Sequence, residues 1–238
     1  MTAKDVIIEL NKHQSDSELE KIKKYFRREE GDYGHGDKFI GIRMGTIFNL
    51  AKKYGDLPIK EIEKLMESPV HEYRVAGISI MDKLSRVKKT PEARRKEMYD
   101  LVMKRTDRIN NWDLVDLAAL HITGSYLYNK SRKVLYTLAK SKDQWERRIA
   151  IVSTAYFIRQ GDVDDTFKIA ELLVKDKQDL IHKATGWMLR FAGDKDKRRL
   201  LAFLDKHAAT MPRTLLRYSI EKLKPAEKKH YMGLKSEV

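Results

Sequence analysis

Two side chains four residues apart place an aromatic ring beside a carboxylate. They are Trp112 and Asp116, at the two ends of the segment Trp-Asp-Leu-Val-Asp. On a helix, residues four apart project from the same side, one turn from each other. An indole face attracts a cation by roughly 0.5 to 2 kcal/mol, depending on desolvation, and a carboxylate among cationic side chains stays ionised. The pair therefore predicts a site for positive charge, such as a cationic base or a developing oxocarbenium sugar.

The other two tryptophans also stand at helical spacing from a charged residue. Trp145 precedes Arg148 by three residues, and Lys183 precedes Trp187 by four. Any one tryptophan is more simply explained by core packing, whereas two beside polar positions in matching segments favour a site. We expect Trp145 to pack inside and to position Arg148.

Several kinds of catalysis are excluded or disfavoured by residue type. The chain has no cysteine, which rules out disulfides, thiolate catalysis and thiolate metal ligands. Its seven histidines are scattered and form no His-Glu-x-x-His pair. No serine lies in a Gly-x-Ser-x-Gly turn. We expect neither a metal nor a cofactor, and we expect Asp113 to serve the start of its helix rather than chemistry.

The charge balance points to a polyanionic partner. The 238 residues include 49 Lys and Arg against 35 Asp and Glu, a net charge of +14. Such a surface attracts nucleic acid and other polyanions, although a lysine-rich surface alone would give the same count. No apolar run approaches the roughly 20 residues that cross a bilayer, and the first ten residues are too charged for a signal peptide. We expect a cytoplasmic, nucleoid-associated protein with no membrane partner.

The apolar residues recur at helical spacing almost throughout, as at Val75 and Ile78. No run of period-two alternation and no Asn-Gly or Asp-Gly hairpin signal interrupts them. Pro58, Pro91 and Pro212 are typical helix-starting residues. The pattern predicts an all-α protein without a sheet.

The predicted helices repeat. Ala76, Ala118, Ala150 and Ala184 are separated by 42, 32 and 34 residues, a period typical of two-helix HEAT or armadillo units. Stacked units predict a curved α-solenoid that forms a single domain over residues 1–238. A residue two before each alanine lies about 200° round the helix, so if the alanines face the core these residues face a concave surface. They are Arg74, Asp116, Arg148 and His182.

Residues 31–38 depart from the helical pattern. They hold three of the twelve glycines and are predicted to form a loop. The segment lacks both a preceding strand and the Lys-Ser/Thr ending of a phosphate-binding loop, so we reject that interpretation.

Several segments resemble the AlkD-type DNA alkylation repair family, whose HEAT-like repeat proteins excise positively charged alkylated bases. The resemblance spans about residues 25 to 222 and is carried by motifs that occur in the family's order. These are Trp112-Asp-Leu-Val-Asp116, Trp145-Glu-Arg-Arg-Ile-Ala150, Lys183-Ala-Thr-Gly-Trp187-Met-Leu-Arg190, Tyr33 to Ile42 and Met211 to Tyr218.

The resemblance implies a monofunctional N-glycosylase for 3-methyladenine and 7-methylguanine in duplex DNA, acting without base flipping. It implies that Asp116 stabilises the oxocarbenium-like sugar and holds the attacking water. Trp112 and Trp187 would contact the lesion-bearing deoxyribose, and Arg148 would bind a nearby phosphate. Tyr25 is assigned to DNA binding on the same ground.

Further basic residues are candidate phosphate contacts, and together they predict binding that weakens steeply with salt. They are Arg43, Arg74, Lys183, Arg190, Arg213 and Arg217. No recognisable motif reads base edges, and no coiled coil or dimer face is evident, so we expect a monomer on double-stranded DNA that carries alkylated bases. The alternatives are a non-catalytic HEAT-type DNA-binding protein and a scaffold for an acidic protein partner, neither of which needs Asp116.

Overall fold

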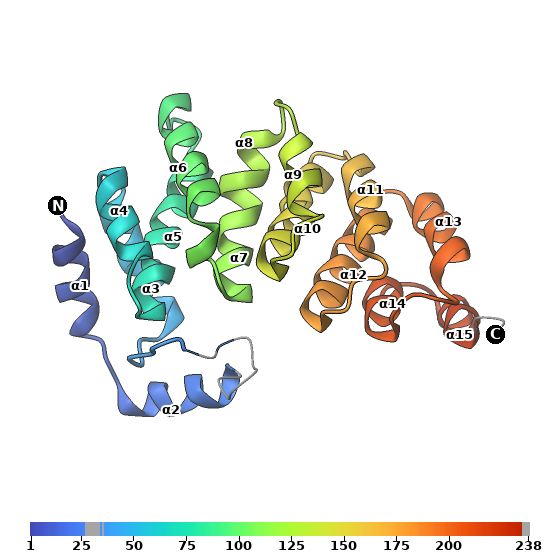
Figure 1. Cartoon of the computed structure of the whole chain (residues 1–238), viewed down its shortest axis with the longest axis horizontal. Helices are drawn as coiled ribbons and strands as arrows, with labels where there is room; N and C mark the ends of the chain where they lie inside the picture. The colour runs from blue at the N-terminus through green and yellow to red at the C-terminus, as the bar shows by residue number, and fades with distance from the viewer. Residues whose placement is uncertain (27–33, 35, 235–238) are drawn as a thin grey trace. The chain divides into compact units, whose positions relative to one another are not determined.

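The computed structural model describes residues 1–26, 34 and 36–234. Within these ranges the regular structure is helical, and the isolated bridge between Lys38 and Val70 belongs to no strand (Figure 1). The predicted all-α repeat architecture is confirmed. No described helix combines the length and the apolar character that crossing a bilayer requires.

The helices form two compact units, residues 1–126 and 127–238. The single domain predicted for residues 1–238 therefore stays a prediction. The first unit contains α1 (Ala3–Asn11), α2 (Asp16–Tyr25), α3 (Met44–Ala51), η1 (Lys52–Tyr54), α4 (Ile59–Met66), α5 (His71–Arg86), α6 (Glu92–Lys104), η2 (Thr106–Arg108), α7 (Trp112–Ala118) and the π-helix η3 (Ala119–Gly124). The short α8 (Ser125–Leu127) crosses the boundary. The second unit contains α9 (Lys133–Leu138), α10 (Gln144–Arg159), α11 (Asp164–Leu173), α12 (Asp179–Gly193), α13 (Lys197–His207), α14 (Arg213–Ile220) and α15 (Pro225–Gly233).

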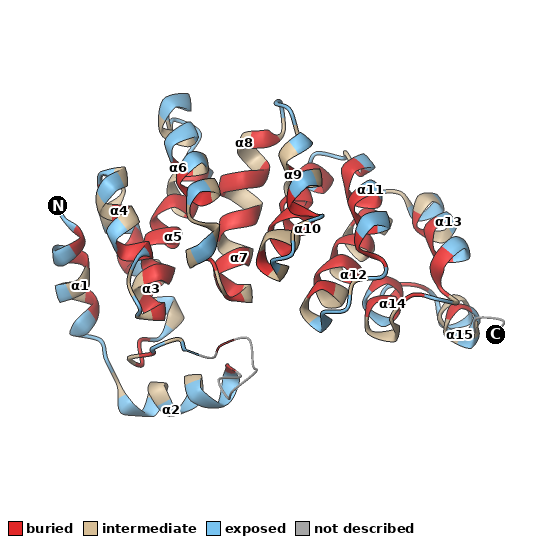
Figure 2. Cartoon of the chain, viewed as in Figure 1, coloured by how far each residue is buried: buried red, intermediate tan, exposed pale blue. Residues whose placement is uncertain are grey.

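Helix α5 is the centre of the first unit. It packs against α3, α4 and α7, and most of its length is buried (Figure 2). Its sequence from Val75 to Met81 is apolar or small on every side, which is typical of a helix enclosed by neighbours. Because α7 packs on α5, the helix that begins with Trp112 rests on the core of this unit.

Helix α12 has the corresponding place in the second unit, where it packs against α10, α11, α13 and α14. Gly186 allows α12 and α14 to approach closely. A Cβ atom at this position would lie 2.5 Å from the Cβ of Tyr218 and 2.6 Å from the carbonyl oxygen of Leu215. The α12–α14 contact therefore depends on the absence of a side chain at Gly186.

The three prolines precede helices as expected. Pro58, Pro91 and Pro212 are the N-cap residues of α4, α6 and α14, one residue before each helix begins. Within the predicted glycine loop, residues 31–33 and 35 lie outside the described residues. Gly36 forms a turn at a φ of 85°, a conformation that favours glycine.

The four repeat alanines are buried, as predicted, but the residues two before them do not all face open solvent. The alanines are 0 to 2% exposed. Asp116 is half-buried, whereas Arg74 and Arg148 are only 3% and 5% exposed. Protein atoms bind the guanidinium groups of these two arginines, and their predicted place on a concave surface stays a prediction. His182, like Asp116, is half-buried.

Candidate functional site

The site in the first unit begins at the N-terminus of α7. Asn111 is fully buried, and its Oδ1 accepts the backbone N–H of Trp112 at 2.8 Å, which caps the helix. Trp112 and Asp116 follow on one side of α7, and both are half-buried. The π-helix Ala119–Gly124 comes directly after α7, and π-helical turns are frequent at functional sites.

Aromatic side chains hold the Trp112 indole in place. Phe26 stacks on it with ring centroids 5.7 Å apart and an interplanar angle of 19°, and Phe26 also stacks on Phe39 at 5.1 Å. Tyr25 meets the indole edge-on at 5.8 Å, and its side chain is exposed. The structure therefore brings together Tyr25 and Trp112, which the sequence analysis had predicted separately, the first as a DNA contact and the second as a contact to the deoxyribose.

A buried chain of charged groups connects the start of α7 to α5. Asp113 Oδ2 lies 2.7 Å from His71 Nε2, and His71 Nδ1 lies 3.4 Å from Asp37 Oδ2. The second oxygen of Asp37 binds Arg74 Nη2 at 2.5 Å. Asp113 also accepts the N–H of Leu114 through Oδ1 at 2.8 Å, so it serves the helix start as expected and anchors it as well.

The protonation of these buried side chains follows from their burial and from the charges beside them. Burial is the largest influence on the pKa of His71 and lowers it, but Asp113 and Asp37 together outweigh burial and raise the pKa to about 9. For Asp37, burial raises the pKa, and the hydrogen bond from His71 with the charge of Arg74 more than reverses this, to about 2. A cationic His71 donates to one carboxylate from each ring nitrogen.

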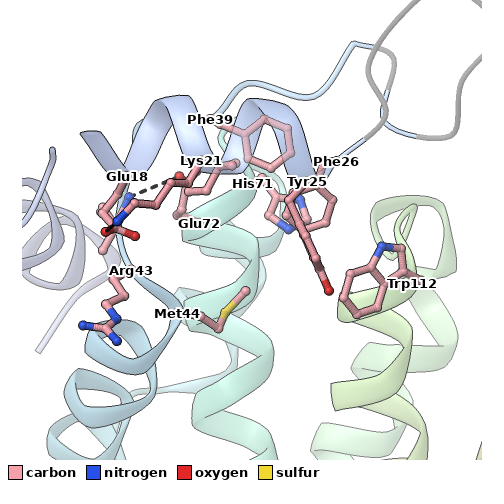
Figure 3. A pocket seen from close by; sticks show the side chains of 12 residues that line it. Glu18, Lys21, Tyr25, Phe26, Phe39, Arg43, Met44, His71, Glu72 and Trp112 are labelled. Atoms are coloured by element: carbon pink, nitrogen blue, oxygen red, sulfur yellow. Dashed lines mark hydrogen bonds and ion pairs between the residues drawn. The ribbon is translucent and has the colours of Figure 1, made fainter. Parts of the chain in front are cut away.

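A cavity of about 440 Å³ lies beside this aromatic group, beneath α2 (Figure 3). We call it the α2 cavity. Its lining comes from α2, the segment before α3, the starts of α3 and α5, and the first residue of α7. The lining residues are Glu18, Lys21, Ile22, Tyr25, Phe26, Phe39, Ile42, Arg43, Met44, His71, Glu72 and Trp112.

In the second unit, α12 carries three predicted residues on one face. Lys183, Trp187 and Arg190 are spaced four and three apart. Lys183 Nζ pairs with Asp179 at 2.7 Å, and Arg190 forms an ion pair with Glu221. Trp187 is half-buried, and its ring meets that of Phe191 edge-on with the centroids 5.8 Å apart.

The remaining predicted arginines differ in how much they are engaged. Arg148 Nη1 donates to the carbonyl oxygen of Leu180 at 2.8 Å. Arg213 donates to the carbonyl oxygens of Met232 and Leu234. Arg43 and Arg217 are exposed, and Arg43 lines the α2 cavity. Trp145 is 7% exposed, which confirms that it packs inside.

Sequence reasoning missed Phe26, His71 and Glu72. His71 meets Asp113 across 42 residues of sequence, so no local spacing connects them. A phenylalanine after a helix and a His-Glu pair at the start of another are common in any helical protein. Among the described residues, no group of three or more His, Cys, Asp or Glu side chains is arranged to hold a metal ion.

The fold and the site define a helical-repeat protein with an aromatic–carboxylate pair on one helix and basic side chains on several others. The family model described as DNA alkylation repair enzyme matches residues 6–223. The chain belongs to this family, so its role is enzymatic, in the repair of alkylated DNA, with DNA as the substrate.

A solved structure has the same fold. It is titled a predicted DNA alkylation repair enzyme from Enterococcus faecalis and is 18% identical, with a TM-score of 0.68. The match covers 90% of this chain and 98% of that chain. No curated protein matches this sequence.

Proposed function

We propose that this enzyme is a DNA glycosylase that hydrolyses the N-glycosidic bond of purines alkylated at N3 or N7 in duplex DNA. The observation that carries the proposal is the Trp112–Asp116 pair on one side of α7, in a family of DNA alkylation repair enzymes. Family membership supports alkylation repair, and the pair supports this particular chemistry.

The reaction needs little catalytic assistance from the protein because alkylation has already made the base a good leaving group. Alkylation at N3 or N7 makes the purine cationic, so the bond between C1′ and the base nitrogen breaks with its electron pair going to the base, which leaves as a neutral molecule. Positive charge develops at C1′, water adds there, and a proton is lost. No general acid is needed, and the demand that remains is stabilisation of charge at the sugar.

Asp116 meets that demand in the proposed mechanism. Its carboxylate stabilises the positive charge at C1′ and orients the attacking water. Trp112 offers its ring face to the same deoxyribose, in an orientation that Phe26 and Tyr25 hold. Trp187 is proposed as a second sugar contact because of its motif. Because these sugar contacts are half-buried rather than enclosed, they are compatible with a base that stays stacked, so we propose that the base is not flipped before cleavage.

The surroundings of each basic side chain guide which residues we propose as phosphate contacts. Arg43 and Arg217 are exposed. Arg148 is 5% exposed and donates to the carbonyl oxygen of Leu180, and it is proposed on its motif alone. Lys183 and Arg190 share a helix face with Trp187. Tyr25 is proposed as a DNA contact because it is 67% exposed beside Trp112.

Two of the predicted phosphate contacts are left out of the proposal. Arg74 is 3% exposed and bound to Asp37, so its charge is already used inside the protein. Arg213 donates to two backbone carbonyls near the end of the described chain.

The decisive experiment replaces Asp116 with asparagine. We expect Asp116→Asn to lower the release of 7-methylguanine from methylated duplex DNA by at least about 100-fold, the scale on which loss of one transition-state charge contact acts. DNA affinity should be equal or higher, because the substitution removes a negative charge from the binding surface. Base release is measured by chromatography and affinity by fluorescence anisotropy.

Asp56→Asn removes an exposed carboxylate from the same unit and serves as the matched control, with release unchanged. A wild-type protein that binds DNA but releases no base would overturn the glycosylase and favour a non-catalytic DNA-binding protein. Binding to plain duplex that ignores salt would favour the scaffold.

A further inference from the structure

His71 contacts both of the supports that hold Trp112. Its Nε2 lies 2.7 Å from Oδ2 of Asp113, the residue that follows Trp112 in α7. Its ring also meets that of Phe26, with the centroids 5.3 Å apart, and Phe26 stacks on the indole. The Trp112 ring is therefore connected to one buried imidazole through its own backbone and through its aromatic neighbour (Figure 3).

The second ring nitrogen of His71 reaches the residue before Trp112 through Asp37. His71 Nδ1 lies 3.4 Å from Asp37 Oδ2. The same oxygen accepts the side-chain N–H of Asn111 at 3.4 Å, and Asn111 Oδ1 in turn accepts the backbone N–H of Trp112. Because Asn111 and Asp113 flank Trp112 in the sequence, the imidazole supports the start of α7 on both sides of the residue that bears the indole.

Only the cationic form of His71 can donate to both carboxylates at once. A neutral imidazole carries one N–H, whereas the imidazolium carries two. The charged groups that face the ring are Asp113 from α7, Asp37 from the segment before α3 and Arg74 from α5, whose Nη2 lies 3.4 Å from His71 Nδ1. Glu72, the next residue of α5, binds backbone N–H groups of the segment before α3 instead.

We propose that His71, as the imidazolium, is a positioning residue that holds the Trp112 ring face toward the deoxyribose while positive charge develops at C1′. The inference rests on the proposed function, in which Trp112 contacts that sugar. A ring held in place stabilises the transition state more than the ground state, because the sugar becomes cationic only as the glycosidic bond breaks. His71 itself touches neither the substrate nor the reacting atoms, so its loss should slow the chemical step and leave DNA affinity unchanged.

The first experiment measures single-turnover release of 7-methylguanine from methylated duplex by His71→Gln, which keeps a neutral donor but removes the ring and its charge. At saturating enzyme and neutral pH we expect release to be about tenfold slower, within the range of one cation–π contact. The enzyme concentration that gives half the maximal rate should stay unchanged. His13→Gln, at an exposed histidine, should release the base as fast as wild type. A His71 variant as fast as wild type would overturn the proposal.

A double substitution separates positioning from a general loss of stability. Trp112→Ala removes the ring that His71 is proposed to hold, so adding His71→Gln to it should slow release no further. If the two effects multiply instead, His71 acts elsewhere and the proposal fails. Thermal unfolding shows whether each variant is folded at the assay temperature.

The wild-type pH profile provides a test that needs no variant to fold. Burial lowers the pKa of His71, but Asp113 and Asp37 raise it to about 9, so the imidazolium is present below pH 9 and is lost above it. After subtraction of the uncatalysed rate, the saturated rate of release should be constant near neutral pH and should fall as the pH rises through 9. A profile that stays flat above 9 would contradict the proposal. His71→Gln should lack the decline.

Tryptophan emission provides a measurement that does not depend on activity. The emission of Trp112 is the difference between the spectra of wild type and Trp112→Ala, and we expect its wavelength to shift as the pH rises from neutral to just above 9. The shift should be absent when the same difference is taken in the His71→Gln background. Should wild type release no base, the glycosylase proposal fails, and this shift would still show that His71 holds Trp112. Release of base without the shift would refute the positioning role and leave the glycosylase standing.

Discussion

His71 is the residue on which the start of α7 depends. It lies between Asp113, beside Trp112, and Asp37, which also holds Arg74. These four side chains are almost fully buried, so each charge relies on the next for compensation. The position of the Trp112 ring is therefore coupled to the protonation of a histidine that does not itself face the proposed reaction.

The pH dependence of the free energy of unfolding should reveal the protonation of His71. Its pKa is 6.5 in the unfolded reference and about 9 in the folded protein, so protonation stabilises the fold fully below pH 6.5 and this contribution is lost as the pH rises through 9. We expect the free energy of unfolding to fall by at most about 3 kcal/mol over that window. His71→Gln should be less stable at pH 6.5 and should lack the decline.

Urea unfolding at a series of pH values measures this effect. His13→Gln, at an exposed histidine, should retain the wild-type dependence. A decline of the same size in the His71 variant would show that another group is responsible.

At the scale of elements, the α12–α14 contact sets the arrangement of the helix that carries Lys183, Trp187 and Arg190. The two backbones approach so closely at Gly186 that any Cβ would overlap α14. The obstructing atoms are a Cβ and a backbone carbonyl, which cannot move aside without shifting the helix.

We expect Gly186→Ala to destabilise the protein by about 1 to 3 kcal/mol, the usual cost of overpacking a tight contact. This loss is opposed by the better helix propensity of alanine, worth about 1 kcal/mol. Gly233→Ala, in the same unit and with nothing near its added Cβ, should leave the melting temperature unchanged or higher. Differential scanning calorimetry compares the two, and an equally stable Gly186 variant would refute the close-contact argument.

At the scale of the whole molecule, the charge of +14 is the property that should govern DNA binding. Each phosphate neutralised by a lysine or arginine contributes about −0.9 to the slope of log affinity against log salt concentration. Arg217 is exposed and belongs to the proposed phosphate contacts.

We therefore expect Arg217→Gln to weaken binding to undamaged duplex and to reduce the steepness of the slope by about 1. Lys12→Gln, which removes an exposed cation outside the proposed set, should leave the slope unchanged. Anisotropy titrations between low and physiological salt give both slopes. Equal slopes for the Arg217 variant and wild type would remove Arg217 from the interface.

The all-helical fold could be predicted because its signals are local. Helical spacing, the prolines before α4, α6 and α14 and the buried alanines of the repeats each express a preference of a few neighbouring residues. The Trp112–Asp116 pair was visible for the same reason, since one helical turn joins the two residues.

Only the tertiary structure decided which charged residues are used inside the protein. Arg74 had the spacing of a surface contact, yet Asp37 and the carbonyl of Ser68 hold it in the interior. The carboxylate partners of His71 and the backbone partners of Glu72 are at least 30 residues away in the sequence. Helical periodicity determines on which side of a helix a residue lies, but segments far away in the sequence determine what packs against that side. They therefore decide whether a charged side chain forms a buried ion pair or stays available to bind DNA.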